Sequence, residues 1–343
     1  METKELHFGI LGCGGAAKYH AAAIRATEGA ELACACGSTA ESTERFSREQ
    51  GCRAAAGFGE MLADPELDVI TLCTPSGLHA EEALAVLRAG KHLLIEKPIA
   101  IQPQDADRIL TAAEASGKMV GVISQMRFSD AAQEIHTAIR AGALGKPVSA
   151  ALTMRYERSQ TYYDSGTWRG TLAMDGGGIL MNQGIHGIDL LTFLMGSVEE
   201  VCGCTATRLR KIEVEDTAGA VLRFASGAIG TIHATVCNPG GAPLRIEICG
   251  ENGSVTLEDE DITFWGLDCP CSIPIGKRNT SSAAASPTGI STENHSRQFA
   301  EFVAAVQSGR QPAVGVRDGR HALQVVCGIY DSAREGRPVK LDI

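Results

Sequence analysis

A glycine-rich turn after the first apolar run of the chain is the feature that most constrains the fold. Residues 6–11 are apolar enough for a buried strand, Gly12-Cys13-Gly14-Gly15-Ala16-Ala17 follows, and residues 18–26 carry apolar side chains at helical spacing. In a strand-turn-helix unit of this kind, the first glycine permits the tight turn and the second leaves room for a pyrophosphate. The start of the helix offers free N–H groups to the phosphates. The predicted cofactor cradle therefore consists of Gly12, Gly14, Gly15, Ala16 and Ala17.

The alternation of apolar runs and helical stretches continues through the first 124 residues. Strands are predicted at 6–11, 31–36, 69–73, 92–96 and 119–124, and helices at 18–26, 41–50, 79–89 and 103–116. This rhythm is typical of β-α-β units, whose right-handed crossovers place the functional crevice at the carboxyl ends of parallel strands. Gly12, Thr74-Pro75 and Lys97 fall at such ends. We therefore predict an α/β chain with a Rossmann dinucleotide-binding domain over residues 1–124.

The pattern changes after residue 124. Helical stretches at 131–141 and from about 178 enclose a strand-like segment at 148–156, and long alternating runs follow at 198–208, 217–224, 228–236 and 243–249. Alternation with glycine-rich turns predicts an open, mainly antiparallel sheet with one covered face. Residues 277–292 are predicted to form a loop, and 294–307 and 317–334 to form closing helices. Residues 125–343 are thus predicted to be an α+β domain for substrate binding and oligomerisation.

The end of the second predicted strand bears on the choice between NAD and NADP. An acid at this position holds the ribose 2′-hydroxyl of NAD, but this chain has Cys36-Gly37-Ser38-Thr39 there. Ser38 and Thr39 are the expected cofactor-binding residues of this turn. No arginine is adjacent to them, and Arg45 follows later in the helix. The cofactor is therefore expected to be NAD or NADP, and this turn leaves the choice open.

Lys97 is the candidate general base. Oxidation of a secondary alcohol requires a base for the hydroxyl proton while a hydride leaves carbon. An amine in a crevice beside a positively charged nicotinamide has its charged form disfavoured, which moves its pKa toward the operating pH. Lys97 ends an apolar run, and Pro98 restricts the geometry of the exit. A solvated lysine at a strand end is the alternative reading.

Asn182, His186 and Asp189 form a second candidate cluster. The spacings of four and three place all three side chains on one side of a helix, with apolar residues on the opposite side. We predict that Asn182 orients a sugar and that His186 acts as a second acid/base group or hydroxyl ligand. Asp189 would fix the imidazole tautomer and contribute to substrate binding. A histidine with a purely structural role is the alternative.

An aromatic and arginine-rich stretch completes the predicted substrate site. Such side chains stack on sugar rings and clamp oxygens or a carboxylate. An ordinary interface between subunits or domains would also use them. The substrate-binding candidates of this stretch are Arg155, Tyr156, Tyr163, Trp168 and Arg169.

Composition excludes several classes of function. A net charge of -10 argues against nucleic acid as a partner, and no apolar stretch approaches the ~20 residues that span a bilayer, so no membrane association is expected. The N-terminus leaves no room for a signal peptide, and twelve scattered cysteines without a Cys-x-x-Cys pair suit unpaired thiols rather than a metal site. We expect a cytoplasmic protein without a metal.

Four motifs together resemble the Gfo/Idh/MocA oxidoreductase family over essentially the whole chain. They are Gly-Ile-Leu-Gly-Cys-Gly-Gly-Ala-Ala at 9–17, Thr-Pro-Ser-Gly-Leu-His at 74–79, Glu-Lys-Pro at 96–98, and Gly-Gly-Gly-Ile-Leu-Met-Asn-Gln-Gly-Ile-His-Gly-Ile-Asp at 176–189. The resemblance implies Lys97 and His186 as catalytic residues, joined by Asn182 as a third candidate. It also implies an open sheet that forms a homodimer or homotetramer. The further cofactor-binding residues expected along the strand ends are Thr74, Pro75, His79, Glu96, Lys97 and Gln125.

The sequence is most similar to the branch of that family containing UDP-N-acetyl-glucosaminuronate 3-dehydrogenases. We therefore predict an NAD(P)-dependent enzyme that oxidises a ring hydroxyl, at C3, of a pyranose, glycoside or sugar acid. Many inositol dehydrogenase-like members have Asp where this chain has Asn182, which puts an Asp-His relay in doubt. Three alternatives stay open: an inositol or cyclitol dehydrogenase, a redox-neutral enzyme that retains its cofactor, and a dinucleotide-binding sensor without turnover.

Overall fold

The computed structural model describes residues 4–276 and 292–342, which divide into two compact units. The N-terminal unit contains residues 4–125 and 292–320, and the second unit contains residues 126–276 and 321–342. Residues 292–320, which are predicted from the sequence to belong to the second domain, lie in the N-terminal unit. The helix α10 (Val316–Glu335) begins in the N-terminal unit and continues into the second. Among the helices of these described ranges, none is long and apolar enough to cross a membrane.

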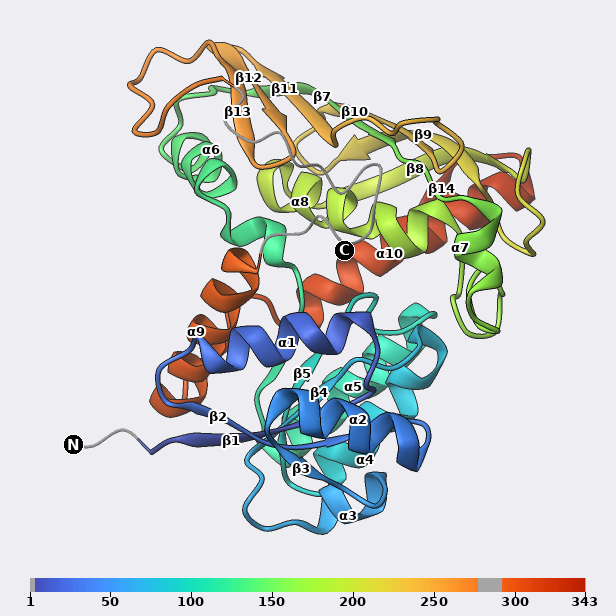
Figure 1. Ribbon diagram of the computed structural model, residues 1–343. Coiled ribbons are helices and arrows are strands. Elements are labelled where there is room, and N and C mark those ends of the chain that lie inside the picture. The colour runs from blue at the N-terminus through green and yellow to red at the C-terminus, as the bar shows by residue number, and fades with distance from the viewer. Residues whose placement is uncertain (1–3, 277–291, 343) are drawn as a thin grey trace. The chain divides into compact units, whose positions relative to one another are not determined.

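The N-terminal unit is a doubly wound parallel sheet, which confirms the predicted Rossmann fold. Its strand order is β3-β2-β1-β4-β5-β6, and neighbouring strands run parallel. The strands are β1 (Leu6–Leu11), β2 (Ala30–Cys36), β3 (Arg53–Ala54), β4 (Val69–Leu72), β5 (His92–Ile95) and β6 (Val120–Val122). The helices between them are α1 (Gly15–Arg25), α2 (Ala40–Gln50), α3 (Phe58–Ala63), η1 (Ser76–Leu78), α4 (His79–Arg88) and α5 (Pro103–Ser116), labelled in part in Figure 1. The strand order reverses at β1 and β4, where such sheets bind ligands.

The helix α9 (Glu293–Ser308) belongs to the N-terminal unit because its apolar face packs into the core of that unit. Phe299 and Phe302 are fully buried, and the ring of Phe299 lies 6.0 Å from that of Phe8 on β1. Each buried phenylalanine contributes about 1.5–3 kcal/mol to stability. Gln298 adds two polar contacts, since it donates to the carbonyl of Val122 at 2.7 Å and accepts from the N–H of Ser124 at 3.0 Å.

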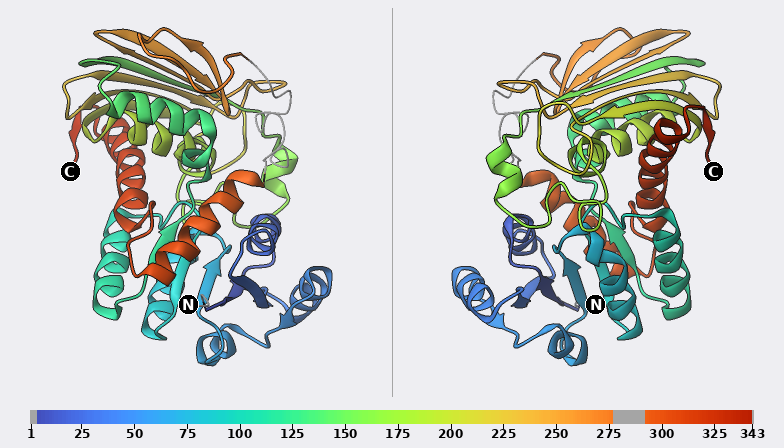
Figure 2. Two further views of the ribbon diagram at one scale, coloured as in Figure 1. Left: turned by 90° about the vertical axis from the view of Figure 1, so that its left-hand side faces the viewer. Right: turned by 90° about the vertical axis from the view of Figure 1, so that its right-hand side faces the viewer.

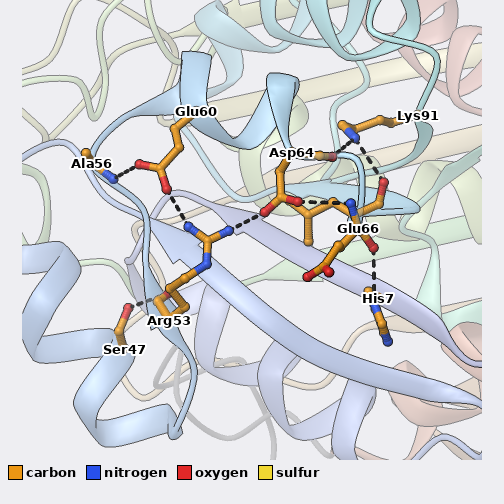
Figure 3. Close-up of polar contacts among 9 residues, drawn as sticks. His7, Ser47, Arg53, Ala56, Glu60, Asp64, Glu66 and Lys91 are labelled. Atoms are coloured by element: carbon orange, nitrogen blue, oxygen red, sulfur yellow. Dashed lines mark hydrogen bonds and ion pairs between the residues drawn. The ribbon is translucent and has the colours of Figure 1, made fainter.

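Polar contacts fix the short β3 and α3, which the apolar pattern did not predict. The Arg53 guanidinium pairs with Glu60 and Asp64 of this segment, and Glu60 also accepts from the N–H of Ala56 at 2.7 Å (Figure 3). The Lys91 ammonium donates to the carbonyls of Asp64 and Leu67 at 2.5 and 2.9 Å. These polar contacts, together with the fully buried side chain of Met61 in α3, hold the segment without a continuous apolar run.

The second unit contains one eight-stranded sheet in the order β13-β12-β11-β7-β10-β9-β8-β14. All pairs are antiparallel except β10 with β7, which confirms the predicted mainly antiparallel sheet. The strands are β7 (Pro147–Arg155), β8 (Val198–Ala206), β9 (Thr217–Phe224), β10 (Ile229–Thr235), β11 (Arg245–Gly250), β12 (Gly253–Glu258), β13 (Asp261–Trp265) and β14 (Val339–Lys340). The remaining helices are η2 (Gln125–Phe128), α6 (Asp130–Arg140), α7 (Gln160–Asp164), η3 (Leu180–Gly184) and α8 (Ile185–Met195).

Among the residues that the structure describes, helices cover one face of this sheet. Figures 1 and 2 show α6, α8 and α10 on the same side of the strands. The strands alternate accordingly, since Leu152 and Met154 of β7 are buried whereas Arg155 is exposed. Gly187 of α8 lies against both buried side chains, because a Cβ there would come within 2.7 Å of Met154 and 3.1 Å of Leu152. The opposite face is therefore the open face of the sheet.

Candidate active site

The glycine turn after β1 fits a dinucleotide. Gly12 has a φ of +95°, and a Cβ there would lie 2.6 Å from the carbonyl oxygen of Cys73, so only glycine fits. Gly14 is the N-cap residue of α1 and Gly15 its first residue. Within the described ranges, a Cβ at either position would meet no atom within 4 Å, so protein packing does not require these two glycines. The close approach of a phosphate to the helix start would account for both glycines, and cofactor binding at this turn stays a prediction.

In the turn after β2, one of the two predicted cofactor-binding residues caps a helix. The Thr39 hydroxyl caps α2 by accepting from the N–H of Ser42 at 3.1 Å, and the N–H of Gly37 donates to Thr43 at 2.9 Å. Ser38 is exposed. Cofactor binding by Ser38 and Thr39 stays a prediction, and the structure gives Thr39 a capping role that the sequence analysis missed.

His79 joins the turn after β4 to the turn after β5. Its Nδ1 lies 2.7 Å from the carbonyl oxygen of Pro98, and its Nε2 lies 2.9 Å from that of Thr74. Burial lowers the pKa of His79, and the two carbonyl oxygens raise it by less. The Thr74 hydroxyl itself donates to Glu82 at 2.5 Å. His79 therefore fixes the position of both strand ends, including the Lys97-Pro98 segment, whose peptide bond is cis.

Glu96 is a buried carboxylate directly before Lys97. His20 of α1 lies 2.9 Å from Glu96 Oε1 through Nε2, and its Nδ1 lies 2.7 Å from the hydroxyl of Thr71. Glu96 Oε2 accepts from the N–H of Lys97 at 3.1 Å. Burial raises the pKa of Glu96, but the hydrogen bond and charge of His20, with Lys97 and His295, hold it well below its usual range. An ionised carboxylate thus adjoins half-buried Lys97.

The sequence analysis missed His20, Thr71 and His295. A lone histidine on the buried face of α1 was the available signal, and its partner is 76 residues away. Gln125, a predicted cofactor ligand, is 5% exposed. Its side-chain oxygen has no hydrogen-bond partner among residues 4–276 and 292–342, and a buried acceptor of this kind suits a ligand that donates.

In the second unit, packing explains two residues of the glycine triplet, Gly177 and Gly178. A Cβ at Gly178 would lie 1.7 Å from the carbonyl oxygen of Glu215, and a Cβ at Gly177 would lie 2.2 Å from the Tyr330 hydroxyl. The Glu215 carboxylate accepts from the N–H groups of Gly178 and Leu180 and from Tyr330, at 2.8, 2.9 and 2.9 Å. Burial raises the pKa of Glu215, and these hydrogen bonds lower it by less. Glu215 therefore anchors the chain where the next helix begins.

The stretch with Asn182 and His186 begins as a π-helical turn rather than as a plain α-helix. Leu180–Gly184 forms this turn, and α8 follows with half-buried His186 in its first turn. Turns of this kind are frequent at functional sites. Asn182 is half-buried and donates through Nδ2 to Asp175 at 2.7 Å. Asp175 is a residue that the sequence analysis did not single out.

Asp189 has a structural partner. Its carboxylate is buried and accepts from Nε and a terminal nitrogen of the Arg127 guanidinium at 2.8 and 2.7 Å. The guanidinium carbon also lies 5.0 Å from the ring centroid of Phe193 on the same helix. Tautomer control and substrate binding by Asp189 stay predictions. The partner seen in the structure is Arg127, from η2, which the sequence analysis missed.

The predicted aromatic and arginine cluster forms in part. The guanidinium carbon of Arg169 lies 5.0 and 4.6 Å from the rings of Tyr162 and Trp168, and that of Arg158 lies 5.8 Å from Tyr162. Tyr163 is buried, and its ring lies 5.2 Å from that of Tyr162.

Two predicted members of that cluster lie differently. Arg155 is exposed on the open face of the sheet, opposite to the side that α8 covers. Tyr156 is buried, 5.7 Å from the guanidinium carbon of Arg158, and burial raises the pKa of its hydroxyl. Substrate binding by Arg155, Tyr156, Tyr163, Trp168 and Arg169 stays a prediction.

Comparison with known proteins agrees with this architecture. Residues 6–124 match the oxidoreductase family with an NAD-binding Rossmann fold, and residues 132–256 match the Gfo/Idh/MocA C-terminal domain. The crystal structure of the WlbA dehydrogenase from Bordetella pertussis, in complex with NADH and UDP-GlcNAcA, is 32% identical. It superposes with a TM-score of 0.89 and covers 99% of this chain and 100% of its own.

Curated relatives extend along almost the full chain. The 1,5-anhydro-D-fructose reductase of Ensifer adhaerens is 27% identical over 93% of both chains. The scyllo-inositol 2-dehydrogenase (NAD(+)) of Bacillus subtilis (strain 168) is also 27% identical, over 97% of this chain and 96% of its own. The glycine turn, the Rossmann sheet and the mainly antiparallel second sheet thus occur together with family matches in both units. The protein is a member of the Gfo/Idh/MocA family of NAD-dependent oxidoreductases.

Proposed function

We propose that this oxidoreductase transfers a hydride between nicotinamide and a ring hydroxyl, at C3, of a pyranose, glycoside or sugar acid. The observation that carries the proposal is Lys97. It follows β5 at the carboxyl edge of an NAD-binding sheet, next to a carboxylate that is held ionised. C3 is the position oxidised in the branch that the sequence resembles, and the WlbA structure contains a sugar acid linked to a nucleotide.

Each candidate residue has a role in this reaction. Bound NAD supplies a hydride acceptor. Lys97 takes the hydroxyl proton, and His79 and Glu96 hold the Lys97 segment in place. Asn182 and His186 hydrogen-bond the sugar hydroxyls. Arg169 with its aromatic neighbours stacks on the substrate and binds its oxygens or a carboxylate.

A cyclitol dehydrogenase is the second candidate. Two relatives favour it, the scyllo-inositol 2-dehydrogenase at 27% identity and the myo-inositol 2-dehydrogenase of Thermotoga maritima at 26%. Asn182 favours the sugar substrate, since an aspartate is expected at this position in inositol dehydrogenases. A redox-neutral enzyme would retain its cofactor through purification, and a sensor would bind it without turnover.

Homodimer or tetramer formation through the open face of the sheet is part of the proposal. Small side chains such as Ala151 and Thr153 of β7 and Val221 of β9 alternate there with buried ones. An open sheet face can pack against a second copy, and the exposed Arg245 and Glu247 of β11, which pair with Thr153 and Ala151, would then lie in the contact surface. A cytoplasmic location fits twelve cysteines without a disulfide among the described residues.

The decisive experiment combines a substrate screen with one substitution. Nicotinamide absorbance is followed with sugars, glycosides, nucleotide sugars and inositols in the presence of NAD or NADP. Lys97→Met should lower kcat about 100-fold or more while NADH still binds. The matched control is Lys118→Met, because Lys118 precedes β6 at the opposite edge of the same sheet and is also half-buried. Equal turnover of the Lys97 and Lys118 variants would remove the assignment of Lys97.

A further inference from the structure

Asp175 is a buried carboxylate whose two oxygens have different partners. It is 2% exposed. Its Oδ1 accepts from Asn182 Nδ2 at 2.7 Å, and its Oδ2 accepts from the backbone N–H of Gly170 at 2.8 Å. The N–H of Asp175 donates to the carbonyl of Thr171 at 3.1 Å. Because backbone contacts hold Asp175 from two sides, the orientation of its carboxylate is fixed before any ligand binds.

This fixed carboxylate determines the orientation of the Asn182 amide. Asn182 donates through Nδ2 to Asp175 Oδ1, so the NH₂ edge of the amide faces Asp175. The amide oxygen then lies on the opposite edge as a fixed acceptor. Asn182 is half-buried in the π-helical turn before α8, four residues ahead of His186. The amide oxygen on that opposite edge is therefore the acceptor that the side chain presents, and the second N–H of the amide can still donate.

We propose that Asp175 is the positioning residue that makes Asn182 an acceptor for a substrate hydroxyl. This inference rests on the proposed function. The proposal also accounts for asparagine at position 182, where an inositol dehydrogenase is expected to have aspartate. The carboxylate is that of Asp175, and it acts on the substrate through the side-chain amide of Asn182. A substrate hydroxyl that donates at this point is recognised through the amide oxygen.

Three variants separate polarity from packing. Asp175→Asn keeps the size of the side chain, and its oxygen can still accept from Gly170 while its NH₂ group faces position 182. The Asn182 amide must then flip, so that its oxygen accepts from position 175 and its NH₂ group faces the substrate. Asn182→Asp places two carboxylates within hydrogen-bond distance, where they share a proton that is lost as pH rises. The double variant Asp175→Asn/Asn182→Asp restores the hydrogen bond with the donor and acceptor exchanged.

The kinetic expectation is loss in both single variants and recovery in the double variant. Each single change should lower kcat/KM by about 10- to 100-fold, since a paired polar group becomes mismatched. The loss in Asn182→Asp should increase with pH. The double variant should recover at least tenfold over either single variant and lose that pH dependence. Asp164→Asn is the matched control, because Asp164 is an exposed carboxylate on α7 of the same unit.

Thermal unfolding without substrate gives an independent readout. The same three variants should show that the double variant is more stable than Asn182→Asp, and the dissociation constant for NADH should stay unchanged in all of them. Recovery of stability without recovery of kcat/KM would overturn the positioning role and leave the proposed function intact. Additive losses in both measurements would overturn the pairing itself. Absence of turnover by the wild-type protein with every compound screened would instead contradict the proposed function.

Discussion

Replacing Arg127 by methionine is expected to destabilise the second unit by about 3–5 kcal/mol. The Arg127 and Asp189 side chains are 8% and 6% exposed, and two hydrogen bonds of 2.8 and 2.7 Å join them. Loss of the guanidinium leaves a carboxylate buried without its cation. The penalty is therefore that of an uncompensated buried charge, which exceeds the cost of the lost hydrogen bonds alone.

Calorimetry measures this penalty as a shift in Tm. For a unit of this size, 1 kcal/mol corresponds to about 2–4 °C, so Arg127→Met should lower Tm by about 6–20 °C. The double variant Arg127→Met/Asp189→Leu removes both charges and should be more stable than Arg127→Met alone. Arg140→Met is the control, since Arg140 is exposed at the end of α6 and should shift Tm by about 2 °C or less.

The Tm values of these variants also test the structural role of Asp189. Equal Tm values for the Arg127 and Arg140 variants would show that the buried pair contributes no stability. A double variant less stable than Arg127→Met would show that Asp189 has a second partner of comparable importance. In that case the predicted contact with the imidazole of His186 would gain support.

Two further substitutions test packing and pH dependence. Gly178→Ala should cost at least about 3 kcal/mol because the new Cβ would lie 1.7 Å from the Glu215 carbonyl oxygen, whereas Gly59→Ala, with no atom within 4 Å in the described part of the chain, should be near neutral. A normal Tm for the Gly178 variant would contradict this packing. Burial raises the pKa of Glu82 from 4.5 to about 7, and the hydrogen bond from Thr74 opposes this by less. The folded N-terminal unit thus holds that proton more tightly than the unfolded chain and loses stability as pH rises from about 4.5 to about 7. Glu82→Gln should raise Tm near pH 8 and leave it unchanged near pH 4, and an equal effect at both would refute the assignment.

The parallel sheet could be predicted from the sequence because buried parallel strands are short, continuous apolar runs. The predicted runs at 6–11 and 92–96 contain β1 and β5 nearly residue for residue. The segment with β3 and α3 has no such signal, since both residues of β3 are exposed and ion pairs of Arg53 hold it. Polar contacts between residues that are distant along the chain leave no periodic trace.

Helical periodicity predicted α9 but could not predict its position in the fold. The pattern identifies an apolar face, and that face can pack against either unit. Phe299 packs near Phe8 of β1, more than 290 positions earlier, so the choice depends on a tertiary contact. The same limit applies to Asp189, since spacing placed it beside His186 but could not reveal Arg127, 62 residues away.

Buried carboxylates are the common element that the sequence could not reveal. Glu96, Asp175, Asp189 and Glu215 are each at most 9% exposed, and the structure pairs each with donors from distant or backbone groups. A carboxylate that accepts from a side-chain amide fixes the NH₂ edge of that amide toward itself and leaves the amide oxygen on the opposite edge. We therefore expect the polarity of the candidate site to depend on buried acids that need not touch the ligand, and the Asp175 and Asn182 variants test this expectation.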